Sequence, residues 1–122
     1  MTSDHRLGKE GEKLAFEYLK THDFLVLKQN WRSGRFGEID LIAKDLGTNE
    51  LVFIEVKSRS TSTDDAKELV TKNKQKRLYK LAHSYLYSSD MEDSPCRFDV
   101  IAIRINEKDT AIEHIKNAFY LS

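Results

Sequence analysis

The sequence predicts an α/β domain whose central mixed sheet of about five strands is flanked by helices on both faces. Two long stretches carry apolar residues at helical spacing, and five shorter runs are rich in β-branched residues or alternate between apolar and polar. Their order is helix, three strands, helix, two strands. A hairpin followed by a crossover helix places antiparallel and parallel strands in one sheet. The 122 residues fit one domain, spanning 1–122.

The first helix is expected from a cap at Ser3 or Asp4 to about Thr21. Gly8 and Gly11 are poor helix formers, and we interpret both as sites where the helix closely approaches a sheet. The expected buried stripe consists of Leu7, Gly11, Ala15, Tyr18 and Leu19.

Three strands are expected next, at 24–29, 37–43 and 51–57. A polar connection over 30–36 joins the first two, and its Trp31 is interpreted as a packing anchor. The link over 44–50 contains Asp, Gly and Asn and predicts a tight hairpin.

The second helix is expected from a Thr71 cap to about Ser88, followed by strands at 97–105 and 111–115. The segment Ser58–Asp65 is rich in Ser and Thr and is expected to form a mobile flap. The apolar stripe of this helix consists of Leu78, Leu81, Ala82, Tyr85 and Leu86.

The composition narrows the class of protein. The net charge is zero, which argues against a strong nonspecific DNA binder. A single Cys96 fits a reducing compartment, and no apolar run approaches the length of a membrane span, so a cytoplasmic location is expected. The sequence has no zinc-ligand spacing, glycine-rich phosphate loop or serine nucleophile elbow.

Asp40, Glu55 and Lys57 are the most informative residues. Side chains alternate along a strand, so Glu55 and Lys57 point the same way, and the hairpin lays Asp40 beside Glu55. Two acids among apolar neighbours repel each other, and a divalent cation would offset that repulsion. The alternative is a surface salt bridge. The strand over 51–57 is apolar on both faces, as in a covered central strand, which favours a functional site.

Three other polar residues either belong to the site or make ordinary structural contacts. Glu12, beside the inward stripe of the first helix, is either a salt-bridge partner or part of the site. Gln75 either reaches the site or donates to a loop carbonyl. Glu38 shares the face of Asp40, and a salt bridge to Arg35 or Arg59 is the favoured reading.

A basic cluster follows the proposed flap, with further arginines near the carboxylates. It is either a solvated helix face or a phosphate-binding surface. The residues concerned are Lys67, Lys72, Lys74, Lys76, Arg77 and Lys80, together with Arg32, Arg35 and Arg59.

Motifs along nearly the whole chain resemble the YraN-like family, which is similar to archaeal Holliday-junction resolvases of the PD-(D/E)xK, restriction-endonuclease-like fold. They are Gly8-x-x-Gly11-Glu12-x-x-Ala15, Asn30-Trp31-Arg32, Gly37-Glu38-Ile39-Asp40-Leu41-Ile42-Ala43, Phe53-Ile54-Glu55-Val56-Lys57-x-Arg59, Lys74-Gln75 with Arg77, Arg97-Phe98-Asp99-Val100 and Ile112-Glu113-His114-Ile115-x-Asn117-Ala118-Phe119. The resemblance implies a nuclease-type site of Glu12, Asp40, Glu55 and Lys57, with Gln75 at a helical position used in some relatives.

We therefore expect metal-dependent hydrolysis of phosphodiester bonds in DNA, branched DNA included. Asp40, Glu55 and the Val56 carbonyl would hold Mg²⁺ or Mn²⁺, with Glu12 completing the shell. Lys57 would orient the attacking water or stabilise the charge that grows on phosphate. A two-fold junction would favour a homodimer. The alternative function is a nucleic-acid-binding accessory module with little or no catalysis.

Overall fold

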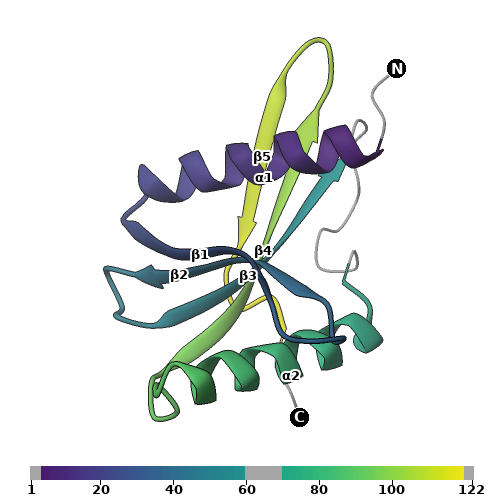
Figure 1. Ribbon diagram of the computed structural model, residues 1–122. Coiled ribbons are helices and arrows are strands. Elements are labelled where there is room, and N and C mark those ends of the chain that lie inside the picture. The colour runs from purple at the N-terminus through teal and green to yellow at the C-terminus, as the bar shows by residue number, and fades with distance from the viewer. Residues whose placement is uncertain (1–3, 60–69, 120–122) are drawn as a thin grey trace.

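The computed structural model describes residues 4–59 and 70–119 (Figure 1). The elements follow the predicted order: α1 (Asp4–Lys20), β1 (Phe24–Arg32), β2 (Glu38–Asp45), β3 (Leu51–Arg59), α2 (Lys72–Ser88), β4 (Cys96–Ile105) and β5 (Thr110–Ile115). Ser3, the side chain of Leu7, the proposed flap from residue 60 on and Lys67 lie outside the described part of the chain.

The five strands form one mixed sheet in the order β1-β2-β3-β4-β5. The only parallel pair in this sheet is β3 with β4, and the other neighbouring strands are antiparallel. Helix α2 makes the crossover between the parallel strands, because two parallel neighbours cannot be joined by a tight turn. The predicted α/β fold with a mixed sheet is confirmed.

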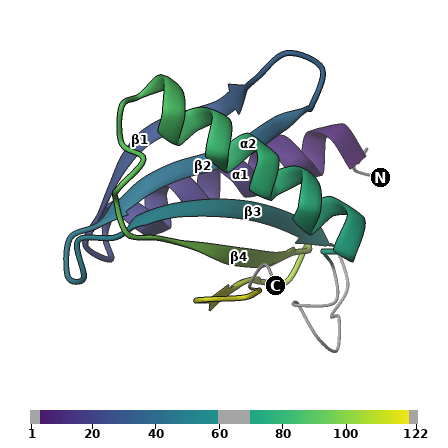
Figure 2. The same ribbon diagram turned by 90° about the horizontal axis from the view of Figure 1, so that it is seen from below.

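The helices lie on opposite faces of the sheet, so each face has its own core (Figures 1 and 2). Alternate residues of β3 serve the two cores: Val52 and Ile54 pack toward α1, and Phe53 packs toward α2. Residues 51–56 are all buried, as expected for a central strand covered on both sides. Within the described ranges, neither helix is long and apolar enough to cross a membrane.

Strand β1 extends farther than the sequence predicts. It continues to Arg32, because Trp31 pairs with Ile39 and Arg32 pairs with Glu38 across the ladder. The register shifts between Val26 and Lys28, and this bulge lets the strand follow β2 to its end. The polar connection is therefore only the five-residue loop over 33–37, between the end of β1 at Arg32 and the start of β2 at Glu38.

The turns and caps that the sequence predicts are present where they are described. Asp45 Oδ1 accepts the N–H of Gly47 at 2.9 Å and of Thr48 at 3.3 Å, which closes the hairpin between β2 and β3. Thr71 Oγ1 accepts the Lys74 N–H at 3.2 Å and caps α2. Both are local devices that depend on residue type at fixed spacing.

The two glycines of α1 differ in their surroundings. A Cβ built on Gly11 would lie 1.7 Å from Oγ of Ser58 on β3, so only glycine lets the helix approach the sheet there. Among the described residues, a Cβ on Gly8 would meet nothing within 4 Å. The prediction of close approach is right for Gly11. It is wrong for Gly8, which lies about one turn nearer the N-terminus of α1.

Candidate metal-binding site at the end of β2 and β3

The hairpin register brings Asp40 and Glu55 to the same end of the sheet. The ladder of β2 and β3 runs from the pair Lys44–Leu51 to the pair Leu41–Ile54, and the two acids are the next residues on each strand. Asp40 Oδ2 then accepts the backbone N–H of Val56 at 2.8 Å. The Asp40 carboxylate thus accepts a backbone amide of β3 just beyond the last ladder pair, Leu41–Ile54, and this hydrogen bond fixes the position of the carboxylate.

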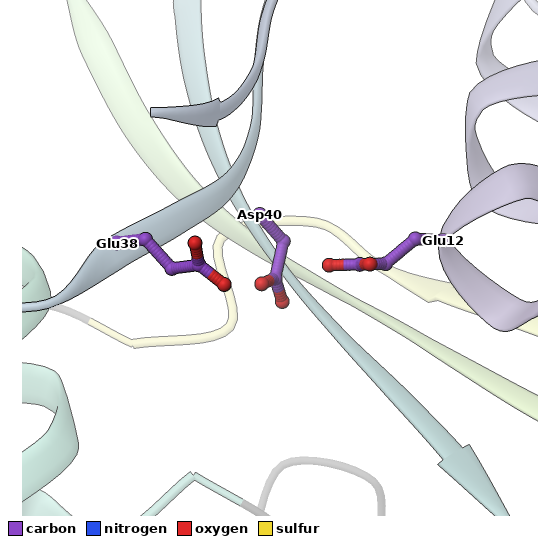
Figure 3. Close-up of side chains that lie close together, drawn as sticks. All are labelled: Glu12, Glu38 and Asp40. Atoms are coloured by element: carbon purple, nitrogen blue, oxygen red, sulfur yellow. The ribbon is translucent and has the colours of Figure 1, made fainter. Parts of the chain in front are cut away.

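Glu12 reaches this carboxylate from α1. Its side chain points across the gap between helix and sheet toward Asp40, while Glu38 approaches from the other side (Figure 3). Carboxylate oxygens of Glu12, Glu38 and Asp40 all lie within 4.8 Å of one another. Within the described residues Glu12 has no salt bridge, so the structure favours its reading as part of the site.

The partner of Glu38 differs from the prediction. Its Oε2 lies 3.2 Å from Nε of Arg32, not beside Arg35 or Arg59. The reason is the extension of β1, which pairs Arg32 directly opposite Glu38 in the ladder. Glu38 pairs with Arg32 and also belongs to the carboxylate cluster with Glu12 and Asp40.

Glu55 is buried at the base of the site between two lysines. Its Oε1 lies 3.6 Å from Nζ of Lys57 and 3.8 Å from Nζ of Lys74. Its Oε2 is buried and has no hydrogen-bond partner within the described residues. An unpartnered buried carboxylate oxygen is costly, and a bound cation or a proton would satisfy it.

Lys74 is the residue whose role the sequence did not show. Its spacing within the basic cluster predicts only a general phosphate contact, but α2 brings its ammonium to the same oxygen as Lys57. No local periodicity could have found this, because Lys74 and Glu55 are joined only by packing of α2 against the sheet.

Burial and mutual repulsion raise the pKa of the acids. Burial, followed by the charges of Asp40, Glu38 and Glu55, raises the pKa of Glu12 from 4.5 to about 7. Burial and the charge of Asp40 raise the pKa of Glu55 from 4.5 to about 7, against the opposing effects of Lys74 and Lys57. Burial also raises the pKa of Asp40, although the Val56 amide and Lys74 act in the other direction. The cluster therefore carries more negative charge than its surroundings stabilise.

The carboxylates line a cleft of about 750 Å³. Arg32 and Arg59 lie on its wall, as the sequence suggests for residues near the site. Lys9 and Asn30 also line it and were not predicted. Ser58, expected to begin a flap next to the site, does line the cleft but belongs to β3, as does Arg59. The complete lining consists of Gly8, Lys9, Glu12, Asn30, Arg32, Glu38, Asp40, Glu55, Val56, Lys57, Ser58 and Arg59.

The remaining predicted residues lie outside the lining of this cleft. Gln75 Nε2 donates to the Val70 carbonyl at 3.0 Å, so the structure favours the reading as a loop hydrogen bond. Arg35 is exposed on the loop between β1 and β2. The other predicted contacts are exposed along α2, namely Lys72, Lys76, Arg77 and Lys80.

The donor set suits a hard divalent cation. Carboxylate oxygens are the ligands that Mg²⁺ and Mn²⁺ prefer, and carboxylates from α1, β2 and β3 meet in one cleft. The unpartnered Glu55 Oε2 adds an oxygen without a competing donor. Fold and site together define an α/β domain with a candidate metal centre at the end of its central hairpin.

Comparison with known proteins places the chain in a family. The model of "Uncharacterised protein family UPF0102" matches residues 11–103, so the chain belongs to the UPF0102 (YraN-like) family. A UPF0102 protein of Thermodesulfovibrio yellowstonii is 50% identical over 115 residues, covering 93% of this chain and 96% of the relative. One of Syntrophus aciditrophicus is 42% identical over 123 residues, covering 100% of this chain and 94% of the relative.

Among solved structures, that of Pyrococcus furiosus SfsA in complex with Ca²⁺ matches at a TM-score of 0.37 and 13% identity. The match covers 90% of this chain and 62% of SfsA. A likeness of this size supports no conclusion about function, and the site's own chemistry has to provide one.

Proposed function

We propose that the protein is a metal-dependent nuclease that hydrolyses phosphodiester bonds of nucleic acid, with DNA as its substrate. The observation that carries this proposal is the convergence of Glu12, Glu38 and Asp40 within 4.8 Å beside the buried Glu55. Acids with pKa values raised by burial and by each other, lying in a cleft, are typical of functional sites.

Asp40 and Glu55 would hold Mg²⁺ or Mn²⁺ together with the Val56 carbonyl, while Glu12 and Glu38 would ligate directly or through water. The bound ion would polarise the phosphate and supply a hydroxide-like water. Asp40 is held in place by the Val56 amide, so its oxygen is oriented before any ligand arrives.

The two lysines provide the positive charge that phosphoryl transfer needs. Lys57 orients the attacking water or stabilises the charge that grows on the phosphate oxygens. Lys74 shares its carboxylate contact and has a third of its side-chain surface exposed. It is therefore free to turn toward a phosphate that enters the cleft.

Basic side chains outside the carboxylate cluster would hold the nucleic acid. Arg32 and Arg59 line the cleft, and exposed lysines and arginine of α2 extend the positive surface beyond it. The cytoplasmic location expected from the sequence belongs to this proposal, since nucleic acid is accessible there.

The second candidate is a nucleic-acid-binding module without catalysis. The zero net charge does not separate it from the nuclease, because either protein would hold phosphates with basic residues clustered on one part of its surface. Lys57 and Lys74 would then neutralise Glu55 as a purely structural ion pair.

A cleavage assay separates the two candidates. The full chain is incubated with single-stranded, duplex, flapped and four-way-junction DNA and RNA, with Mg²⁺ or Mn²⁺ and with EDTA. The nuclease proposal expects metal-dependent cleavage that Asp40→Asn and Lys57→Ala reduce at least about 100-fold. Lys20→Ala, an exposed change at the last residue of α1, should have little effect. Lys57→Ala should bind nucleic acid almost normally. Wild-type protein that binds these substrates but cuts none of them with either metal would favour the binding module.

A further inference from the structure

The loop between β1 and β2 is anchored beside the cleft. It joins Arg32 to Glu38, and both of these residues line the cleft. The Phe36 N–H donates to the Ser33 carbonyl at 3.2 Å, and Ser33 Oγ lies 2.8 Å from Oγ of Ser84 on α2. The loop is thus closed on itself and fastened to the helix.

Glycine at Gly37 sets the direction of this loop. Its φ of +100° is open to glycine but strained for other residues, and it turns the chain back into β2. The backbone geometry therefore decides where the side chain of Phe36 goes.

The two aromatic residues near this loop have opposite orientations. Trp31 packs inward, with its ring edge-on to Tyr85 at 5.3 Å between centroids. Phe36 is 55% exposed and has no ring contact within the described residues. One exposed ring is common on a protein surface, so the significance of Phe36 lies in its position on an anchored loop whose two ends line the cleft.

The charge around Phe36 indicates what the ring would meet. Arg35, the neighbour of Phe36 in the loop, is exposed and has no salt bridge in residues 4–59 and 70–119. Arg32, where the loop begins, is also exposed and is paired with Glu38 at the cleft wall. An exposed aromatic ring beside arginines is the combination that proteins use to stack a base while holding its backbone. An acidic or apolar protein surface would satisfy only one of these two features.

We propose that Phe36 stacks on an unpaired base next to the bond held in the cleft. This inference rests on the proposed function and narrows its substrate to nucleic acid with unpaired bases near the cut, as in single strands, flaps and junctions. The base pairs inside a continuous duplex are already stacked on both sides and offer no free face to a phenyl ring. Arg35 would contact the adjoining phosphate.

Binding without metal tests this proposal separately from cleavage. Fluorescence anisotropy at fixed salt, in EDTA, measures affinity for a single strand, a flap, a four-way junction and a blunt duplex, each as DNA and as RNA. Phe36→Ala should weaken binding of the single strand and the flap roughly 5- to 100-fold and leave duplex binding nearly unchanged. Phe36→Trp should retain affinity, because it keeps an aromatic face.

Tyr87 provides the matched control. It is 75% exposed at the far end of α2, so Tyr87→Ala removes an exposed aromatic ring away from the cleft and should change nothing. A 2-aminopurine base placed beside the cut should lose fluorescence on binding to the wild type and not to Phe36→Ala. The DNA and RNA series show which of the two supplies the unpaired base.

Any one of three binding results would overturn the proposal: no binding by the wild type, an equal loss on single strand and duplex, or an unchanged affinity of Phe36→Ala. Sedimentation that shows a wild-type dimer and a Phe36→Ala monomer would assign the ring to a protein contact and would also overturn it. A nuclease that cuts normally with Phe36→Ala on flaps would refute this inference and leave the proposed function intact. A wild type that binds unpaired bases through Phe36 but cuts none of the substrates would support this inference and refute the proposed function.

Discussion

The ammonium group of Lys74 lies 3.8 Å from Oε1 of Glu55, although the two residues come from a helix and a strand on either side of a long connection. Lys57 contacts the same oxygen from β3 at 3.6 Å. We expect Lys74→Ala to reduce cleavage about 100-fold, because a preorganised charge near the phosphate is lost. Single-turnover rates with Mg²⁺ measure the effect.

Lys76→Ala is the control for this prediction. Lys76 is exposed on the same helix, so its loss removes a charge without changing the carboxylate site. Equal rates for the two variants would assign Lys74 to general phosphate binding. The Thr71 cap remains in both, so melting temperatures should stay close to that of the wild type.

The raised pKa values of Glu12 and Glu55 make stability depend on pH. The unfolded chain releases these protons near pH 4.5, and the folded chain keeps them to about pH 7. Since the native state binds more protons in this window, the free energy of unfolding should fall as pH rises through it, by no more than ~1.4 kcal/mol per pH unit for each proton. Urea titrations across the window measure this slope, and Glu55→Gln should flatten it.

Divalent metal should restore the stability that the protein loses as pH rises. Ligation requires ionised carboxylates, so millimolar Mn²⁺ or Mg²⁺ should raise the melting temperature at alkaline pH and have little effect at acidic pH. Asp40→Asn should abolish the increase. A wild type that is equally stable with and without metal at alkaline pH would contradict a preformed site.

Replacing the two glycines of α1 by alanine should change the stability of the fold in opposite directions. Gly11→Ala should cost about 1–3 kcal/mol of stability, because the new methyl group collides with Ser58 on β3. It should also lower activity, since the helix that carries Glu12 has to shift. Gly8→Ala meets no atom within 4 Å in the described part of the chain and should stabilise the fold by up to about 1 kcal/mol through helix propensity. Denaturant midpoints of the two variants that move in the same direction would contradict this account.

A buried ionic network supports the other end of the sheet. The carboxylate of Asp99 is fully buried, and it accepts from Arg97 Nε at 3.0 Å and lies 2.7 Å from His114 Nε2. Burial raises the pKa of Asp99, but the bonds from His114, Arg97 and the Asn117 amide outweigh it and hold the pKa below its usual range.

Asp99→Asn should therefore cost about 3–5 kcal/mol, because it removes the fully buried negative charge that Arg97 and His114 both contact. Asp109→Asn is the comparison, since its ion pair with Arg104 is exposed and should contribute less than about 1 kcal/mol. Chemical denaturation measures both. Similar small losses would show that Arg97 is satisfied by Asp45 and Glu50, which also contact it.

The sequence by itself determined the order of the elements and the face on which Asp40, Glu55 and Lys57 lie. Helical and strand periodicities are local, so the pattern of apolar residues predicts each element, and alternation along β3 predicts that Glu55 and Lys57 are neighbours. The Thr71 cap and the hairpin after Asp45 are local in the same sense, since they depend on residue types a few positions apart.

Tertiary structure alone decided which side chains meet across elements. The pairing of Glu38 with Arg32 depends on how far β1 follows β2, and the position of Lys74 depends on how α2 crosses the sheet. The difference between Gly8 and Gly11 depends on the closeness of α1 to Ser58. Distances, and the desolvation that raises the pKa of Glu12 and Glu55, come from packing between distant segments, and residue spacing along the chain does not encode either.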